Sequence, residues 1–214
     1  MIDFILDLIY PNVCGFCGKI NNESLCNECE EKINPKLVCN IDKYEDKFFS
    51  EHLYLFKYEE NIRKSILEYK FNDKDYLYKT FSKIIIKNEK ICGFFKKYDI
   101  IIPVPIHKKR FNVRGYNQSE LIAKEIAKNI KSIKFENNIL FKIQNTNPQS
   151  TLNKLDRSIN AQNAYSIKNS ERFKNKNILL LDDIYTTGST VNECSRILKL
   201  NNAKDIGIIT LAKD

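Results

Sequence analysis

Apolar positions along the chain fall into short continuous runs and longer helical stripes. The runs at 98–104 and 177–182 are apolar almost throughout, which is typical of strands buried on both faces. Leu77, Phe81, Ile84 and Ile85 repeat at the three- and four-residue spacing of a helix. Strands are predicted at 52–58, 98–104, 138–143, 177–182 and 205–211, and helices at 61–70, 74–87, 117–130 and 189–200. Because strands alternate with helices, we expect an α/β fold with a parallel sheet and right-handed crossovers.

Three polar stretches interrupt this pattern. Residues 30–50 lack periodicity, so we place a boundary there, between a small module at 1–45 and a main domain at 46–214. A long polar loop is predicted after the strand at 98–104. Residues 144–160 contain few apolar side chains and are long for a connection in a compact domain, so they are either disordered or functional.

The composition is that of a globular protein. Of 214 residues, 43% are hydrophobic and 29% are charged, and only 6 are glycine and 5 proline, which excludes collagen-like and disordered chains. No apolar run approaches the ~20 residues that span a bilayer. Residues 1–10 are apolar, but Asp3 and Asp7 interrupt them and no basic region precedes them, so they do not form an export signal. We therefore expect a soluble cytoplasmic protein without a membrane span.

The formal charge of +8 is unevenly distributed. Residues 1–50 carry 5 basic and 9 acidic side chains, whereas residues 51–150 carry 20 and 11. An acidic N-terminal segment followed by a basic segment indicates a polyanionic partner for the basic segment. The alternative is a lysine-rich sequence whose side chains are simply solvated.

Four cysteines form a Cys-x2-Cys-x8-Cys-x2-Cys pattern at Cys14, Cys17, Cys26 and Cys29. Without an export signal, thiolate ligation of a metal is a better interpretation than disulfides. Two such turns can complete the tetrahedron that suits Zn²⁺, with no position left for a substrate, so the zinc would be structural. We expect Gly15 and Gly18 to supply backbone freedom for the turns. The alternative is four unligated thiols. Cys92 and Cys194 lie among apolar neighbours and are predicted to be core residues, and Cys39 has no Cys-x2-Cys partner.

Two adjacent acids, Asp182 and Asp183, follow the apolar run at 178–181, and a hydroxyl-rich turn at 186–190 then begins a helix. Ligands of parallel sheets bind at the carboxyl ends of the strands, and a helix start favours a phosphate. A phosphate in the turn and carboxylates one sugar away suit a ribose 5-phosphate. No nucleotide-triphosphate loop and no Gly-x-Gly-x-x-Gly motif occurs. The alternative is an ordinary helix cap after a buried strand.

The loop after the strand at 98–104 is basic, with Lys108, Lys109, Arg110 and Arg114 just beyond the strand end. These donors suit a diphosphate leaving group in the same crevice, unless the loop is merely solvated. His107 in the same loop is interpreted as incidental.

The segment 180–190 resembles the phosphoribosyl pyrophosphate (PRPP) signature of type I phosphoribosyltransferases. Three further features narrow the resemblance to the ComF-type competence proteins. They are the cysteine motif, residues 103–118, and residues 149–152 followed by Arg157, Asn160, Ala164 and Tyr165. That family often carries a second cysteine pair, of which only Cys39 remains here. The resemblance implies a phosphoribosyltransferase-like parallel sheet with flanking helices and an N-terminal zinc knuckle.

The resemblance also implies roles for individual residues. Arg110 and Arg114 would belong to the pyrophosphate loop, and Lys154 and Arg157 to a mobile catalytic flap together with Gln149 and Asn160. Magnesium would enter with the diphosphate. The PRPP-binding residues would be Val104, Pro105, Asp182, Asp183, Thr186, Thr187, Gly188, Ser189 and Thr190.

The activity implied is displacement of pyrophosphate from PRPP by an acceptor that the sequence does not identify. The family is associated with natural transformation, in which incoming single-stranded DNA moves into the cytoplasm, often beside a ComFA-type helicase or translocase. Two alternatives remain open. One is a PRPP-sensing accessory that handles DNA, and the other is a zinc-dependent docking module on a degenerate transferase body.

Overall fold

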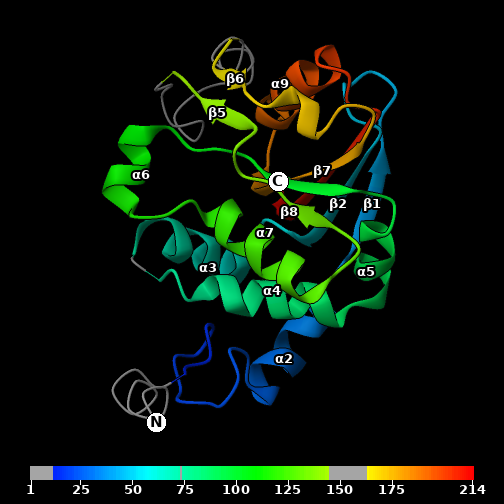
Figure 1. The fold of residues 1–214 in the computed structure, drawn as a ribbon. Coiled ribbons are helices and arrows are strands. Elements are labelled where there is room, and N and C mark those ends of the chain that lie inside the picture. Colours follow the sequence, from blue (N-terminus) through cyan, green and yellow to red (C-terminus); the bar gives the residue numbers. More distant parts are fainter. Residues whose placement is uncertain (1–11, 73, 145–162) are drawn as a thin grey trace.

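The computed structural model describes residues 12–72, 74–144 and 163–214 (Figure 1). The helices are α2 (Asn27–Ile33), α3 (Glu60–Phe71), α4 (Leu77–Lys87), α5 (Glu89–Phe95), α6 (Lys108–Arg114), α7 (Gln118–Asn129) and α9 (Ser189–Leu200). The strands are β1 (Asn40–Lys43), β2 (Glu51–Lys57), β3 (Ile100–Pro103), β4 (Lys134–Phe135), β5 (Leu140–Lys142), β6 (Tyr165–Ile167), β7 (Asn177–Tyr185) and β8 (Asp205–Lys213). No helix in these ranges is long and apolar enough to cross a membrane.

Six strands form the central sheet in the order β1-β2-β8-β7-β3-β4. All neighbours are parallel except β1, which runs antiparallel to β2 at one edge. A separate antiparallel pair, β5 and β6, stands above the carboxyl side of the sheet (Figure 1). The predicted α/β class with a mostly parallel sheet and flanking helices is confirmed.

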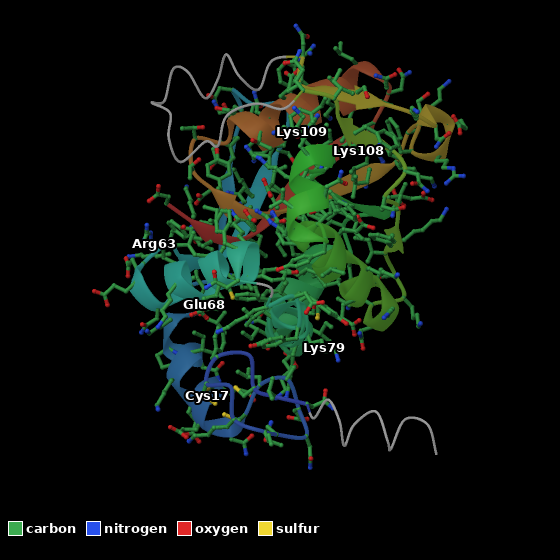
Figure 2. All side chains as sticks on the ribbon, turned by 90° about the vertical axis from the view of Figure 1, so that its left-hand side faces the viewer. Cys17, Arg63, Glu68, Lys79, Lys108 and Lys109 are labelled. Atoms are coloured by element: carbon green, nitrogen blue, oxygen red, sulfur yellow. The ribbon has the colours of Figure 1, made fainter. Side chains whose placement is uncertain are left out.

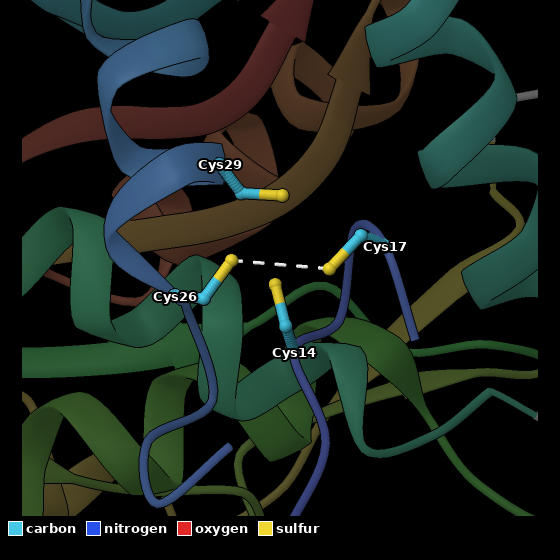
Figure 3. A group of neighbouring side chains, drawn as sticks. All are labelled: Cys14, Cys17, Cys26 and Cys29. Atoms are coloured by element: carbon cyan, nitrogen blue, oxygen red, sulfur yellow. Dashed lines mark hydrogen bonds between the residues drawn. The ribbon is translucent and has the colours of Figure 1, made fainter. Parts of the chain in front are cut away.

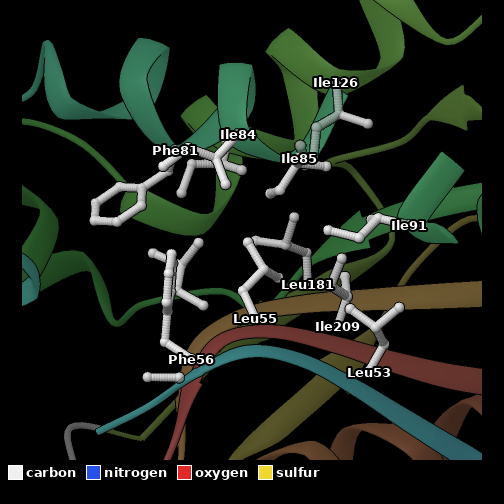
Figure 4. Close-up of a cluster of buried hydrophobic side chains, with 14 of the residues drawn as sticks. Leu53, Leu55, Phe56, Phe81, Ile84, Ile85, Ile91, Ile126, Leu181 and Ile209 are labelled. Carbon is white, nitrogen blue, oxygen red and sulfur yellow. The ribbon is translucent and has the colours of Figure 1, made fainter. Parts of the chain in front are cut away.

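Side chains of the central strands alternate between two cores. Leu179 and Leu181 of β7 pack with α3, α4, α5 and α7, and Figure 4 shows this core between the helices and the strands. Ile178 and Leu180 point to the opposite face and pack with α9, β5 and β6. This two-residue alternation explains the continuous apolar run, because both faces of a covered parallel sheet are buried.

The predicted elements differ from the structure in several places. The stretch after β3 contains a helix, α6, where a loop is predicted, and β7 continues three residues past 182. Helices α2 and α5 and strand β1 lie in segments for which no regular element is predicted. These are short elements whose apolar positions are too few to show a period.

The N-terminal segment packs against the helical layer rather than standing apart. Cys14, Leu25 and Ile33 belong to the same buried cluster as Ile66 of α3 and Phe81 of α4. Residues 40–43 form the edge strand β1 of the main sheet. The division at residue 45 stays a prediction, and β1 lies on its N-terminal side.

Candidate functional site

The two adjacent acids lie where β7 extends past its neighbour β3. β3 pairs with β7 as far as Leu181, and the Val104 N–H adds one further bond of 2.9 Å to the Leu181 carbonyl. β7 then continues to Tyr185 beside β8 alone. Asp182 and Asp183 are therefore inside a strand, yet they lie beyond the carboxyl end of β3. That is the sheet edge at which parallel α/β folds bind ligands.

Asp183 is turned into the protein. Its side chain is 5% exposed, and Lys70 Nζ, at the end of α3, lies 2.8 Å from its Oδ1. Gln118 Nε2, at the start of α7, donates to its Oδ2 over 2.7 Å. Both oxygens of Asp183 thus have a partner within the protein. Lys70 is absent from the predicted site, and Gln118 appears there only within the segment 103–118.

Asp182 occupies a different environment. Successive residues of a strand point to opposite faces, so Asp182 lies on the α9 side, half-buried. The Asp183 N–H donates to its Oδ1 over 2.9 Å, and Ser119 Oγ lies 3.4 Å from the same oxygen. Burial and the negative charge of Asp183 raise the pKa of Asp182 to about 7, against the opposing charges of Lys70 and Lys142. The two acids are therefore not equivalent.

Residues 186–190 form a turn that begins α9. Gly188 precedes the first helical residue with a φ of +73° and supplies no side-chain cap. The Thr187 and Ser189 hydroxyl oxygens are 2.7 Å apart, and Thr186 and Thr190 are half-buried beside them. The first N–H groups of a helix have no intrahelical acceptor. Together with these hydroxyls, they form an arrangement suited to an anion.

Tyr185 supports this turn from behind. A Cβ on Gly188 would lie 2.5 Å from Cζ of Tyr185, so only glycine allows the turn to approach the ring. The ring stacks on buried His52 with centroids 4.4 Å apart. His52 Nε2 lies 2.8 Å from Thr210 Oγ1, and burial lowers the pKa of His52 to about 3, so the imidazole is neutral. Lys213 Nζ lies 5.7 Å from the centroid of the Tyr185 ring.

The basic segment after β3 is a short helix, α6, which corrects the prediction of a loop. His107 has a defined role there, because its Nδ1 accepts the Lys109 N–H over 3.2 Å and caps the helix. Lys108 and Lys109 point outward into solvent (Figure 2). Arg110 and Arg114 are half-buried. The helix therefore carries two exposed and two half-buried cations.

Lys142 on β5 is a basic residue that the predicted site does not contain. Its Nζ lies 5.2 Å from the centroid of the Tyr165 ring on β6. Burial and the charge of Arg110 lower the pKa of Lys142, and Asp182 opposes this shift. Arg110 of α6 and Asp182 of β7 thus both act electrostatically on Lys142 of β5. Only tertiary packing could reveal this group, because β5 carries no motif of its own.

Most predicted site residues gather at one sheet edge. They come from the end of β3, the end of β7, the turn into α9, and α6. Lys154 and Arg157, and with them Gln149 and Asn160, lie outside the described residues. The gathered residues are Val104, Pro105, Arg110, Arg114, Asp182, Asp183, Thr186, Thr187, Gly188, Ser189 and Thr190.

The four N-terminal cysteines converge on one point (Figure 3). Their sulfur atoms all lie within 4.8 Å of one another, and those of Cys17 and Cys26 are 3.8 Å apart. A tetrahedral zinc with Zn–S bonds of about 2.3 Å separates its sulfur ligands by about 3.8 Å. Burial opposes ionisation of Cys14, but backbone N–H groups around its sulfur lower its pKa to about 6. The four cysteines can hold a metal ion such as zinc.

The cysteine cluster is fixed to α4. A Cβ on Gly15 would lie 2.7 Å from Leu77 Cδ2, so Gly15 is required for close approach, whereas Gly18 adopts a φ of +72°. Thr80 Oγ1 donates to the Ser24 carbonyl over 2.6 Å. The knuckle therefore docks by backbone contact as well as by side chains.

The other cysteines have separate environments. Cys194 is buried in the core beneath α9, as predicted. Cys92 is only half-buried, and its thiol donates to the Ile86 carbonyl over 3.2 Å. Cys39 is buried and accepts from Asn88 Nδ2 over 3.6 Å.

A cavity of about 410 Å³ separates the cysteine cluster from α3. Lys32 is paired with Glu28 at 2.6 Å, and Lys74 with Glu68 at 2.9 Å. Figure 2 shows Cys17 and Glu68 on opposite sides of this region. In the part of the chain that the structure describes, two further cavity lysines form no ion pair. These are Lys36 and Lys64.

Comparison with known proteins adds to this geometry. The sequence profile of the phosphoribosyl transferase domain matches residues 117–214, which include β7, the turn at 186–190 and α9. Competence protein F of Haemophilus influenzae is 27% identical over 212 residues, covering 91% of this chain and 92% of that protein. The chain is therefore similar to the ComF-type competence proteins. Competence protein ComFC of Streptococcus pneumoniae is 26% identical over 211 residues, covering 99% of this chain and 85% of that protein.

A hypoxanthine phosphoribosyltransferase from Staphylococcus aureus superposes with a TM-score of 0.39 at 12% identity, over 63% of this chain and 64% of that one. The predicted resemblance to ComF-type proteins is confirmed by the sequence comparisons, and the cysteine cluster fits the zinc knuckle that it implies. The chain is thus similar to ComF-type competence proteins, and its C-terminal part matches the phosphoribosyl transferase domain.

Proposed function

We propose that the chain binds PRPP with magnesium at the edge formed by β3, β7 and α9. The observation that carries this proposal is the start of α9, where Gly188 provides no side-chain cap and Ser189 N–H donates over a long 3.4 Å to Thr187 Oγ1, together with the half-buried Asp182 carboxylate. The turn at 186–190 would hold the 5-phosphate through N–H and hydroxyl donors. Asp182 would accept hydrogen bonds from the ribose hydroxyls. Each such bond to a charged acceptor contributes roughly 1.5–3 kcal/mol.

The diphosphate would lie toward α6. Arg110 and Arg114 supply guanidinium groups, which suit phosphate oxygens in fixed geometry. Magnesium prefers oxygen ligands and keeps several waters, so it would enter on the diphosphate rather than in a cage of side chains. Lys154 and Arg157 would close over this end of the ligand and exclude water.

The reaction that fits this site is displacement at the anomeric carbon of PRPP. The bond to the pyrophosphate oxygen breaks, pyrophosphate leaves with its electron pair, and the acceptor's nucleophilic atom bonds to that carbon. The transition state would have oxocarbenium character, so the site would act by positioning and by stabilising the departing charge. This makes the protein a glycosyltransferase whose acceptor is unidentified.

The cysteine cluster would hold a structural zinc. A closed set of four thiolates leaves no coordination position open, and such sites contribute roughly 10–16 kcal/mol to the folding of small modules. Because the knuckle packs on α4, the metal would stabilise the face from which α3 reaches the PRPP site.

The biological role we propose is natural transformation. The support is that the homologues are named competence proteins. In this role the protein would act in the cytoplasm on incoming single-stranded DNA, beside a ComFA-type helicase or translocase. The basic side chains of residues 51–150 would contact phosphates of that strand.

Calorimetric titration with PRPP and Mg²⁺ tests the ligand. We expect binding by the parent protein and little binding by the double variant Asp182→Asn/Asp183→Asn, with both proteins equally folded by circular dichroism. Asp46→Asn is a matched control, because Asp46 is exposed and its ion pair is with the neighbouring Lys47. Equal affinity of the parent and the double variant would refute the site.

A second function is supported by the cavity beside the cysteine cluster. Its Lys36 and Lys64, which form no ion pair with any described residue, favour a non-catalytic accessory that senses PRPP and contacts DNA through the zinc module. In that case PRPP binds without release of pyrophosphate in the presence of nucleobase, amine or DNA acceptors. Lys36→Ala/Lys64→Ala would then weaken binding of a single-stranded oligonucleotide without changing PRPP affinity. Pyrophosphate release with any of these acceptors would instead support the transferase.

A further inference from the structure

A continuous chain of hydrogen bonds links Asp183 on β7 to Arg114 on α6. Gln118 is the middle member, with Nε2 donating to Asp183 Oδ2 over 2.7 Å and Oε1 accepting from Arg114 Nη1. Asp183 and Gln118 are both buried, and Arg114 is half-buried. The chain therefore runs from the protein interior to the place proposed for the diphosphate.

The chemistry of the three groups allows only one arrangement. An ionised carboxylate only accepts, and a guanidinium only donates. The Gln118 amide must therefore turn its NH₂ group to Asp183 and its oxygen to Arg114. The amide orientation follows from these partners, and it fixes where one nitrogen of the guanidinium lies.

Residues from α3 hold this chain in place. Tyr69 Oη donates to the Gln118 backbone carbonyl over 2.8 Å, and the Arg114 guanidinium lies 5.3 Å from the centroid of the Phe71 ring. Lys70, between them in sequence, lies 2.8 Å from Asp183 Oδ1. Consecutive residues of one helix therefore contact all three members of the chain, which limits their freedom to move.

The charges leave Arg114 available to an anion. Lys70 forms a direct ion pair with Asp183, so this carboxylate, whose charge also raises the pKa of Arg114, is shared between two cations. Arg114 receives only the neutral amide oxygen of Gln118 from this chain. Burial lowers the pKa of Arg114, which means that its charge is incompletely solvated. A phosphate oxygen would supply a negative partner in direct contact with the guanidinium.

We propose that Asp183 is a positioning residue that acts through Gln118 to orient Arg114 toward the diphosphate of PRPP. Asp182 is then the carboxylate that holds the ribose hydroxyls, and the two adjacent acids serve opposite ends of the ligand. This inference rests on the proposed function, and it assigns Gln118 and Lys70 to the same site as supporting residues.

The test separates the two ends of PRPP. Magnesium pyrophosphate, ribose 5-phosphate and magnesium PRPP are titrated by calorimetry into the parent, Asp182→Asn, Asp183→Asn and Gln118→Met, after circular dichroism has shown that each is folded. In Asp183→Asn the new amide oxygen would face Lys70, and its NH₂ group would face Gln118. The Gln118 amide would then flip and present NH₂ to Arg114, and that bond would be lost.

We expect Asp183→Asn and Gln118→Met to weaken pyrophosphate and PRPP binding about tenfold, and to leave ribose 5-phosphate within about twofold. Asp182→Asn is expected to weaken ribose 5-phosphate about tenfold and to leave pyrophosphate within about twofold. The proposal would be overturned if Asp183→Asn weakens the binding of ribose 5-phosphate and leaves the binding of pyrophosphate unchanged. Asp183 would then be a second ligand of the ribose hydroxyls.

A second measurement does not need PRPP. NMR of the arginine side chains in the ligand-free protein, with Arg114→Lys to assign the signal, should show hindered rotation of the Arg114 guanidinium. This hindrance should disappear in Gln118→Met and in Asp183→Asn. If it persists in both, the positioning chain is refuted. If the parent binds none of the three ligands, the proposed function fails, and with it the diphosphate role of Arg114.

Discussion

Alanine in place of Gly188 should destabilise the protein more than any ordinary surface substitution. The residue precedes α9 with a φ of +73°, a region that side chains with a Cβ rarely adopt. The added Cβ would also lie 2.5 Å from Cζ and 2.7 Å from Cε2 of Tyr185. Tyr185 has little room to yield, because it is buried and stacked on His52.

The two effects add to a measurable cost. The left-handed conformation costs roughly 1–2 kcal/mol for an L-residue. Forcing a buried ring aside costs typically 1–3 kcal/mol. The free energy of unfolding should therefore fall by about 2–5 kcal/mol, a large share of the 5–15 kcal/mol that is typical of domains. PRPP affinity should fall too, because the turn at 186–190 would have to move away from Tyr185.

Urea denaturation followed by circular dichroism measures the first effect, and Gly115→Ala is its matched control. Gly115 has a φ of +82°, but a Cβ there meets no atom within 4 Å. It should lose only the conformational share, about 1–2 kcal/mol. If the two variants lose the same stability within about 0.5 kcal/mol, then the contact with Tyr185 does not restrain the turn, and the reasoning fails.

Three further predictions concern protons and metal. PRPP affinity should rise from about pH 6 to 8, because Asp182, whose pKa is raised to about 7, must ionise to accept hydrogen bonds from the ribose hydroxyls. Calorimetry should show that Asp182→Asn lacks this part of the pH dependence. The same change of affinity with pH in Asp182→Asn would contradict the prediction. The double variant Cys14→Ser/Cys17→Ser should contain no zinc in elemental analysis. Its Tm should be lower, because Cys14 is buried in the core shared with α4, but its PRPP affinity should remain. A loss of PRPP binding would show that the cysteine cluster and the PRPP site are inseparable. His52 has a pKa of about 3 in the folded protein, below its ordinary value of about 6.5. The stability that comes from its neutral form is therefore present above pH 6.5 and is lost as the pH falls toward 3. The difference in unfolding free energy between the parent and His52→Leu should shrink over that pH range, and a constant difference would refute this assignment.

The arrangement of strands and helices could be predicted well where the apolar pattern is long. Helix 189–200 matches α9, and the run at 177–182 lies within β7. The pattern failed for α6, whose seven residues contain none that is buried. A helix without a buried face has no apolar period, and its caps, His107 and Gly115, carry the signal instead.

The sequence by itself determined the α/β class, the group of four cysteines that could hold a metal ion, and the turn from β7 into α9. These depend on residues close together in the chain, since side-chain periodicity and short ligand spacings are local properties. Tertiary structure alone decided that Asp182 and Asp183 differ. The Gln118 partner of Asp183 is 65 residues away, and Lys70 comes from another helix again. Such partners depend on how α3 and α7 pack on the sheet, and packing of distant elements leaves no period in the sequence.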